Sequence, residues 1–180
     1  MILGFTGKMG TGKSTLCSYL ELKSDKQRVR INFKDALVEE MKKNFDPVMN
    51  KIAAFYGIDK NLLFQEKPPI MRALMQCYGT EVRRGDDPDY WTKQWKKKVT
   101  GATEKGYDVL TDDVRFRNEA EAVREVGGVV IRVVRSDIQE TGSHQSEVEM
   151  DSIVSNFEIL SVKGELGSSY DQLENIIRSL

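Results

Sequence analysis

The chain has 180 residues, of which 39% are hydrophobic and 31% charged, a composition that predicts a globular protein with a buried core. Its 27 basic and 28 acidic residues give a net charge of −1, without the basic excess that is typical of proteins binding long nucleic acids. A single histidine and two distant cysteines exclude a Cys/His zinc site and a disulfide framework.

Membrane and export signals are also missing from the sequence. No uncharged apolar run approaches the roughly 18 residues of a membrane span, and the N-terminus does not resemble a signal peptide. We therefore expect a cytoplasmic protein with no membrane partner and no nucleic acid polymer as partner. A homodimer is compatible with the sequence, which does not decide the oligomeric state.

Short apolar and β-branched segments alternate with helical patterns along the chain. The expected strands are Ile2–Thr6, Val29–Asn32, Tyr107–Thr111, Val129–Val134 and Phe157–Leu160. Helices expected between and after them include Ser14–Leu22, Asn118–Val126 and Ser169–Leu180. This order predicts a single α/β domain over residues 1–180, with a five-stranded, mostly parallel sheet flanked by helices.

Two segments interrupt this alternation. Residues 34–101 are rich in helical patterns and too long for a simple crossover, so we interpret them as a helical insertion that covers a substrate. Residues 136–150 are polar and follow the fourth strand. We expect them to form a short lid that closes over phosphates and brings Arg135 toward them.

The most informative motif is GKMGTGKS at residues 7–14, which satisfies GxxxxGK[ST] between an expected strand and an expected helix. Its glycines allow successive N–H groups to face a phosphate, Lys13 can reach the β- and γ-phosphates, and the Ser14 hydroxyl can bind Mg²⁺. No guanine-reading NKxD motif follows, so a signalling GTPase is not indicated. The expected ATP-binding residues are Gly7, Gly10, Thr11, Gly12, Lys13, Ser14 and Thr15.

Charged residues follow the third expected strand. Asp112, Asp113 and Arg115 stand where the carboxyl end of a strand meets ligands in open α/β sheets. We expect one of the two acids to hold Mg²⁺ through water.

A helix is expected from Ile70 to about Arg84. At helical spacing, Arg72, Gln76, Gly79 and Arg83 form one stripe, and Ile70, Ala73, Leu74 and Cys77 form the opposite, apolar face. Two arginines, a glutamine and a gap at Gly79 suit a phosphorylated, base-bearing ligand, so we interpret the stripe as facing a cleft.

Two further sets of residues are interpreted as packing. Trp91, Trp95 and Val99 also lie at helical spacing, which is typical of a packing stripe beside a lysine-rich solvated face. The methionines Met41, Met49, Met71 and Met75 are expected to fill the core.

Together these motifs resemble the deoxynucleoside monophosphate kinases of bacteriophages, a branch of the P-loop nucleoside monophosphate kinases. The resemblance rests on the order and spacing of residues 4–15, 33–37, 72–76, 78–83, 89–91, 113–120, 127–128 and 144–147. It implies the P-loop kinase fold and transfer of the ATP γ-phosphate to a deoxynucleoside 5′-monophosphate (dNMP), with Mg²⁺.

The resemblance also implies roles for individual residues. Lys13 and Ser14 serve ATP and the metal, and Asp113 and Arg115 lie where both phosphates meet, with Asp113 as a second metal ligand. The residues implied to be catalytic are Lys13, Asp113, Arg115 and Arg135, and those implied to bind the acceptor are Lys34, Asp35, Arg72, Gln76, Arg83 and Trp91. Ala36 and Arg117 stand where the family often has proline, which leaves the base preference open.

Two other functions stay open. A phosphate monoester is already ionised at pH 7 and needs no general base, whereas a hydroxyl acceptor benefits from a nearby carboxylate. Asp35 could be such a base, so the first alternative is a kinase acting on a hydroxyl of a nucleoside or another small metabolite. The second is a non-catalytic ATP-sensing module, which needs the phosphate loop but no arginine-lined acceptor site.

Overall fold

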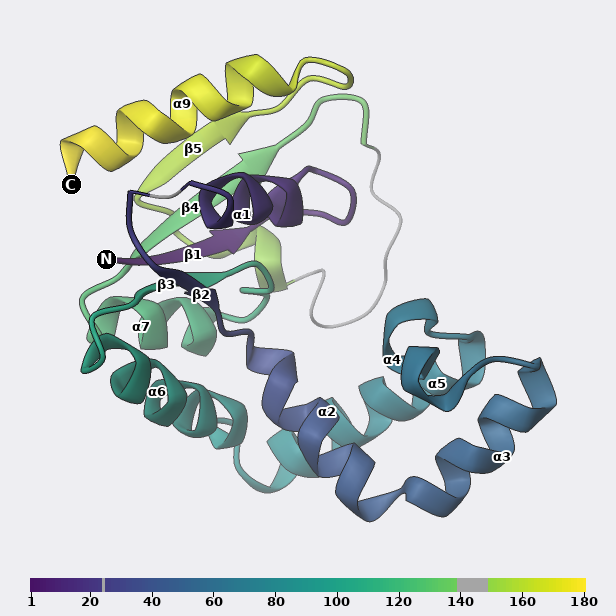
Figure 1. The fold of residues 1–180 in the computed structure, drawn as a ribbon. Helices are drawn as coiled ribbons and strands as arrows, with labels where there is room; N and C mark the ends of the chain where they lie inside the picture. The colour runs from purple at the N-terminus through teal and green to yellow at the C-terminus, as the bar shows by residue number, and fades with distance from the viewer. Residues whose placement is uncertain (24, 139–148) are drawn as a thin grey trace. The chain divides into compact units, whose positions relative to one another are not determined.

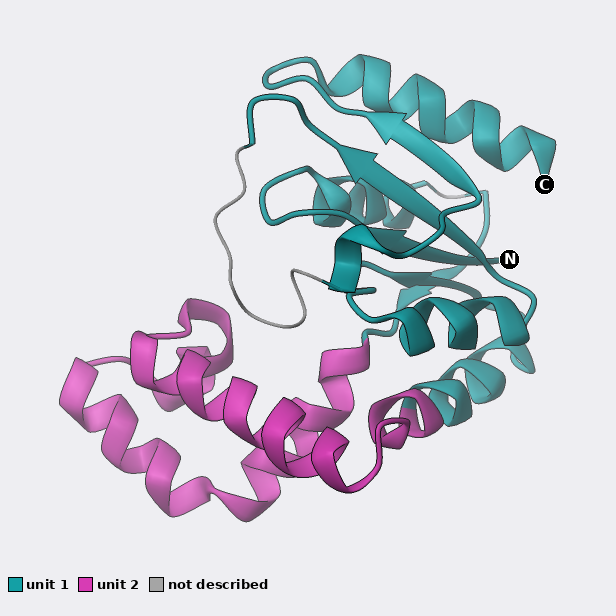
Figure 2. Cartoon of the chain, turned by 180° about the vertical axis from the view of Figure 1, so that it is seen from behind, with its two compact units in different colours: residues 1–32, 95–180 teal, residues 33–94 magenta. Residues whose placement is uncertain are grey.

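A computed structural model describes residues 1–23, 25–138 and 149–180. The chain divides into two compact units, residues 1–32 with 95–180 (unit 1) and residues 33–94 (unit 2), coloured separately in Figure 2. Within the described ranges, no helix has both the length and the apolar character needed to cross a membrane.

Unit 1 is built on a five-stranded sheet in the order β2-β3-β1-β4-β5 (Figure 1). Its strands are β1 Ile2–Thr6, β2 Arg28–Arg30, β3 Asp108–Thr111, β4 Val129–Val134 and β5 Phe157–Leu160. The predicted five-stranded sheet is confirmed, and all of its neighbouring strands pair in parallel. β1 is central, with Leu3 opposite Leu110 on one side and Val129 on the other.

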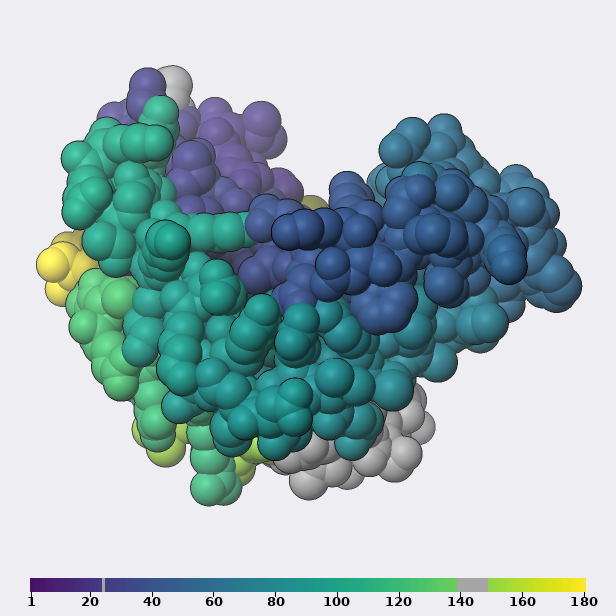
Figure 3. Space-filling model, turned by 90° about the horizontal axis from the view of Figure 1, so that it is seen from below, coloured from purple at the N-terminus to yellow at the C-terminus, as the bar shows by residue number. Residues whose placement is uncertain are grey.

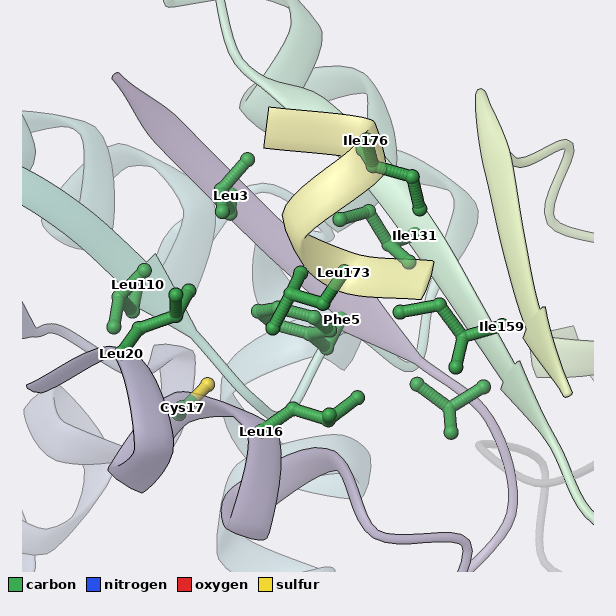
Figure 4. Close-up of a cluster of buried hydrophobic side chains, with 11 residues drawn as sticks. Leu3, Phe5, Leu16, Cys17, Leu20, Leu110, Ile131, Ile159, Leu173 and Ile176 are labelled. Atoms are coloured by element: carbon green, nitrogen blue, oxygen red, sulfur yellow. The ribbon is translucent and has the colours of Figure 1, made fainter. Parts of the chain in front are cut away.

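Helices cover both faces of this sheet (Figure 1). They are α1 Lys13–Glu21 and α9 Leu166–Ser179 on one face, and α7 Arg117–Glu125 with the second half of α6 Tyr90–Thr103 on the other. Because side chains alternate along a strand, Leu3 and Phe5 of β1 point into the cluster under α1 and α9. Figure 4 shows this cluster, which also contains Leu16, Cys17, Leu20, Leu110, Ile131, Val133, Ile159, Leu173 and Ile176.

The outer edge of β5 is partly closed by a side chain of α9. The Leu160 N–H donates to Gln172 Oε1 at 3.0 Å, and Gln172 Nε2 donates back to the Leu160 carbonyl at 3.0 Å. One amide therefore satisfies both backbone groups of Leu160, as a neighbouring strand would.

Unit 2 is helical. It contains α2 Phe33–Asn44, α3 Asp46–Tyr56, the 3₁₀ turn η1 Lys60–Leu62, α4 Leu63–Glu66, α5 Pro69–Gln76 and the π-helix η2 Cys77–Arg84. Met41, Met49 and Met71 are at most 1% exposed in its core, and Met75 packs against them, as predicted. The unit ends at Gln94, because from Trp95 onward α6 packs against the sheet of unit 1.

The segment from Ile70 to Arg84 differs from the single α-helix that we expected. It changes to a π-helix at Cys77, and the wider turn alters which side chains share a face. Ile70, Ala73 and Cys77, which were assigned to the apolar face opposite the polar stripe, are exposed. The core contacts come instead from Met71, Leu74, Met75 and Tyr78.

The packing stripe of α6 is confirmed. Trp91, Trp95 and Val99 are 3%, 1% and 0% exposed, and the Trp95 indole N–H donates to the Ile31 carbonyl at 2.8 Å. The opposite face of α6 carries lysines, of which Lys96 pairs with Glu125 of α7. Figure 3 shows the side of the molecule on which α6 and α7 reach the surface, in teal and green.

The close approach of α7 to β4 yields a stability prediction. A Cβ at Gly128 would stand 2.8 Å from both the Val123 carbonyl and Ile2 Cγ2, so Gly128→Ala should lower the free energy of unfolding by about 2–3 kcal/mol. Gly101→Ala in α6, where nothing lies within 4 Å, should instead raise it by about 0.5–1 kcal/mol. Urea unfolding measures the free energy of unfolding of both variants. If α7 can move away from β4 without cost, Gly128→Ala will not be destabilised.

Candidate functional site: the phosphate loop and its charged surroundings

The loop between β1 and α1 has a backbone that only glycine permits at its first position. Gly7 has a φ of 133°, and a Cβ there would stand 2.2 Å from the Val133 carbonyl oxygen of β4. Gly10 and Gly12 also take positive φ, at 83° and 103°. The loop is closed internally by Thr11, whose hydroxyl donates to the Lys8 carbonyl at 3.0 Å. The sequence motif therefore forms a wound loop that leads into the N-terminus of α1, the geometry that binds phosphate.

Lys13, in the first turn of α1, is held across this loop. Its Nζ donates to the Gly7 carbonyl at 2.5 Å and to the Lys8 carbonyl at 2.7 Å. Burial, and to a smaller extent Arg115, lower the pKa of Lys13 from 10.5 to about 8, against the opposing effect of Asp112 and Asp113. The lysine is still largely charged at pH 7, and its partners are neutral carbonyls.

The acidic segment after β3 lies close enough to act on Lys13. Both acids are buried, at 6% and 7% exposed for Asp112 and Asp113. The Asp112 N–H donates to Asn32 Oδ1 at 2.9 Å, and the Arg115 N–H donates to Glu119 Oε2 at 2.7 Å. The structure thus brings Asp112, Asp113 and Arg115 near the phosphate loop, as the strand order predicted.

Arg135, just after β4, also contacts the loop. Its Nη1 donates to the Gly10 carbonyl at 2.8 Å and its Nε to Asp137 Oδ1 at 2.7 Å. A cavity of about 230 Å³ opens beside these groups, lined by Gly7, Lys8, Thr11, Arg132, Val133, Val134, Arg135, Ile138 and Asp151. Most of the expected lid, including His144, lies outside the described residues.

The donor atoms near the loop fit Mg²⁺. The Ser14 side chain is exposed in the first turn of α1, and carboxylates follow β3. Hydroxyl and carboxylate oxygens are hard ligands, and Mg²⁺ usually keeps several waters and binds substrate phosphates. Within the described part of the chain, no group of three or more His, Cys, Asp or Glu side chains could hold a metal. A metal here would therefore take its remaining ligands from nucleotide and water.

The residues expected to bind the acceptor lie in unit 2. Arg72 and Gln76 are exposed on α5, and Lys34 and Asp35 are half-buried in the first turn of α2. The expected gap at Gly79 is wrong, because Leu37 Cδ2 would stand 3.1 Å from a Cβ at that position. Trp91 was expected to line the acceptor pocket, but it is 3% exposed and donates its indole N–H to the Gly79 carbonyl at 2.8 Å. Its contacts are those of a packing residue.

Arg83 belongs to a polar cluster that the sequence did not reveal. Its guanidinium pairs with Glu40 and stacks over the rings of Tyr78 and Tyr90, at 5.2 and 5.0 Å from their centroids. Both tyrosine hydroxyls donate to Glu40, at 2.6 and 3.0 Å. Burial tends to raise the pKa of Glu40, but these hydrogen bonds and that of Arg83 outweigh it and lower the pKa.

Arg30, at the end of β2, is a candidate functional residue that the sequence analysis did not identify. Its Nη1 donates to Asp112 Oδ2 at 3.1 Å, and its Nη2 donates to Glu21 Oε2 at 2.6 Å. The available signal was its spacing of two from Arg28, which directly precedes the expected strand Val29–Asn32, and this spacing predicts a shared face without naming partners.

Comparison with known proteins gives consistent results. A family model described as deoxynucleotide monophosphate kinase matches residues 13–166. The chain is 27% identical to a putative deoxynucleotide monophosphate kinase of Acanthamoeba polyphaga mimivirus, over 96% of this chain and 94% of the relative. It is 31% identical to the deoxynucleotide monophosphate kinase of Escherichia phage RB69, over 60% of this chain and 45% of that protein. A shikimate kinase from Aquifex aeolicus vf5 has a TM-score of 0.48 and 16% identity, over 99% of this chain and 98% of that one.

The burial of Lys13 predicts that this lysine lowers the free energy of unfolding at neutral pH, although the site needs it. Its pKa is about 8 in the folded chain and 10.5 as the ordinary value, so the wild type gains stability as the pH rises through that interval. Lys13→Met should therefore raise the free energy of unfolding at pH 7, by on the order of 2 kcal/mol, and this advantage should shrink toward pH 10. Urea unfolding at both pH values measures it. Lys97→Met, at an exposed lysine of α6, is the matched control, and an equal difference at both pH values would contradict the prediction.

Proposed function

Because this chain belongs to the deoxynucleotide monophosphate kinase family, we propose that it transfers the γ-phosphate of ATP to the 5′-phosphate of a dNMP. The products are ADP and the deoxynucleoside diphosphate, a precursor for DNA synthesis. The observation that carries the proposal is the phosphate loop of unit 1, with Lys13 across it and with Arg135 and the two acids that follow β3 around it. Both substrates are small molecules.

We assign the donor site to unit 1. The N–H groups of the loop and of the first turn of α1 bind the donor phosphates, and Lys13 exchanges its carbonyl partners for phosphate oxygens. This exchange is favourable because an anionic acceptor strengthens the hydrogen bonds of an ammonium group. Arg115 and Arg135 supply further positive charge as negative charge develops on the transferred group.

Mg²⁺ fits this assignment. When bound, it neutralises charge on the donor phosphates. Ser14 and Asp113 are the residues of this chain that we propose to hold it.

The acceptor oxygen belongs to a phosphate and needs no deprotonation. With a second pKa near 6, the 5′-phosphate is largely dianionic at pH 7; its oxygen bonds to the γ-phosphorus as the bond to the β-γ bridging oxygen breaks. The task of the protein is to offset repulsion between two anions. We propose that Arg72, Gln76 and Lys34 of unit 2 contact the acceptor, and that Arg83, held by Glu40, supports them.

The alternative acceptor is a hydroxyl, with Asp35 as the base. It predicts phosphorylation of free deoxynucleosides, which lack the 5′-phosphate. The non-catalytic ATP-sensing module is not supported, because the family to which the chain belongs consists of kinases.

The proposal predicts a substrate pattern. In a coupled assay of ADP release, deoxynucleoside monophosphates should be accepted, and free deoxynucleosides should not. Lys13→Met should lower kcat by roughly a hundredfold or more, because it removes charge stabilisation from the transition state. Activity toward nucleosides alone would make the hydroxyl-acceptor alternative correct, and a kcat within threefold of wild type would remove the assigned role of Lys13.

A second prediction separates the two kinds of acceptor by mutation. If the acceptor is a phosphate, Asp35→Asn should change the acceptor KM more than kcat, because no proton has to be removed. A general base would instead contribute on the order of 100-fold or more to kcat. Arg72→Ala should raise the acceptor KM while leaving ATP affinity within about threefold. Steady-state kinetics with each substrate varied in turn, beside direct ATP titration, measures both variants.

A further inference from the structure

Arg30 joins two parts of unit 1 that meet at the phosphate site. One side of its guanidinium lies along α1, where Nε and Nη2 donate to the two oxygens of Glu21 at 3.1 and 2.6 Å. Nη2 also reaches the Ser18 hydroxyl at 2.9 Å and the Ser14 carbonyl at 3.4 Å. The remaining nitrogen, Nη1, donates to Asp112 Oδ2 at 3.1 Å. A single planar group thus connects one stripe of α1 with the acid at the end of β3.

Arg30 is a charged partner of Asp112, whose side chain is only 4% exposed. A buried carboxylate is costly unless it is paired and hydrogen-bonded. Its backbone is held at the same time, since the Asp112 N–H donates to Asn32 Oδ1. The carboxylate is therefore fixed from the side of β2, and it is one of the charges that act on Lys13.

Arg28 offers an internal comparison. It stands two residues earlier on β2, so its side chain lies on the same face, and it also binds α1. Its Nη1 donates to the Leu20 carbonyl at 3.0 Å and to Asp25 Oδ1 at 2.7 Å, at the opposite end of the helix from the phosphate loop. Both arginines tie β2 to α1, and of the two, Arg30 is the one bonded to Asp112.

We propose that Arg30 is a positioning residue of the phosphate site, which fixes the Asp112 carboxylate relative to Ser14 and the first turn of α1. The inference rests on the proposed function in taking residues 7–14 as a site for nucleotide phosphates and Ser14 as a residue that holds Mg²⁺. Arginine suits this role because its planar fork donates in several directions at once, whereas a lysine ammonium cannot span the same partners. Asp112 then serves as a fixed outer charge beside the metal-binding hydroxyl of Ser14.

The test measures ADP affinity by calorimetry, with saturating Mg²⁺ and with EDTA. The ratio of the ADP affinity with Mg²⁺ to the ADP affinity with EDTA reports how much the metal strengthens binding. Its measurement requires no turnover. Arg30→Gln should lower this ratio by about tenfold or more, because it releases the outer carboxylate of Asp112, and loss of an outer group around a metal site typically costs that much in metal affinity. Asp112→Asn should lower it similarly, and the double variant should lose no more than either single variant, because the two side chains act as one unit.

Arg28→Gln is the matched control, and it should lower the melting temperature while keeping the wild-type ratio. Arg30→Lys is a second variant in case the protein with Arg30→Gln does not fold, and it should also lower the ratio. The proposal is overturned if Arg30→Gln or Arg30→Lys keeps the wild-type ratio, or if the losses from Arg30→Gln and Asp112→Asn add in the double variant. It is equally overturned if Mg²⁺ does not alter ADP affinity in the wild type.

These outcomes are independent of the acceptor. A wild type that binds ADP with Mg²⁺ but phosphorylates no dNMP contradicts the proposed function and leaves the role of Arg30 to be decided by the affinity ratios. A wild type that phosphorylates dNMPs while Arg30→Gln keeps its ratio contradicts only the role of Arg30.

Discussion

The backbone of Gly7 passes the Val133 carbonyl so closely that a methyl group would stand 2.2 Å from the oxygen. Because β1 and β4 are neighbours in the sheet, this contact determines how the chain leaves β1 and winds into the loop. The loop in turn places the first turn of α1, where Lys13 and Ser14 stand. The fold and the candidate site of unit 1 therefore depend on the absence of one side chain.

The cations of this protein are held by partners of very different strength. Lys13 rests on two backbone carbonyls of the loop, which are neutral acceptors, and Arg135 divides its guanidinium between the Gly10 carbonyl and the more exposed Asp137. Arg83 is paired with a carboxylate and enclosed by two tyrosine rings, and Arg30 is bound by two acids. A cation is bound more strongly by an anionic acceptor than by a neutral carbonyl, so a phosphate displaces carbonyls more readily than carboxylates. This difference separates groups suited to meet a ligand from groups that hold other residues in place.

The features predicted correctly from the sequence are those encoded locally. Short apolar and β-branched runs predicted all five strands, and the spacing of glycines with Lys13 predicted the loop, because each pattern spans a few residues. The missed features are contacts between distant residues: Arg30 and Asp112 are 82 positions apart, and Arg83 and Glu40 are 43 apart. The π-helix at Cys77 was missed because the preceding α-helical spacing continues through it without a break in composition. The contact of Leu37 with Gly79 was also missed, because Leu37 belongs to another helix and the local sequence around Gly79 does not indicate it.

The paired amide of Gln172 also affects how the sheet can meet other chains. β5 is an outer strand, and an unpaired strand edge is a template for adding another strand. At Leu160 both backbone groups are already satisfied, and the neighbouring outward position carries the exposed charge of Glu158. A strand approaching this edge would have to break two hydrogen bonds at Leu160. Extension of the sheet by pairing at this position of β5 is therefore disfavoured.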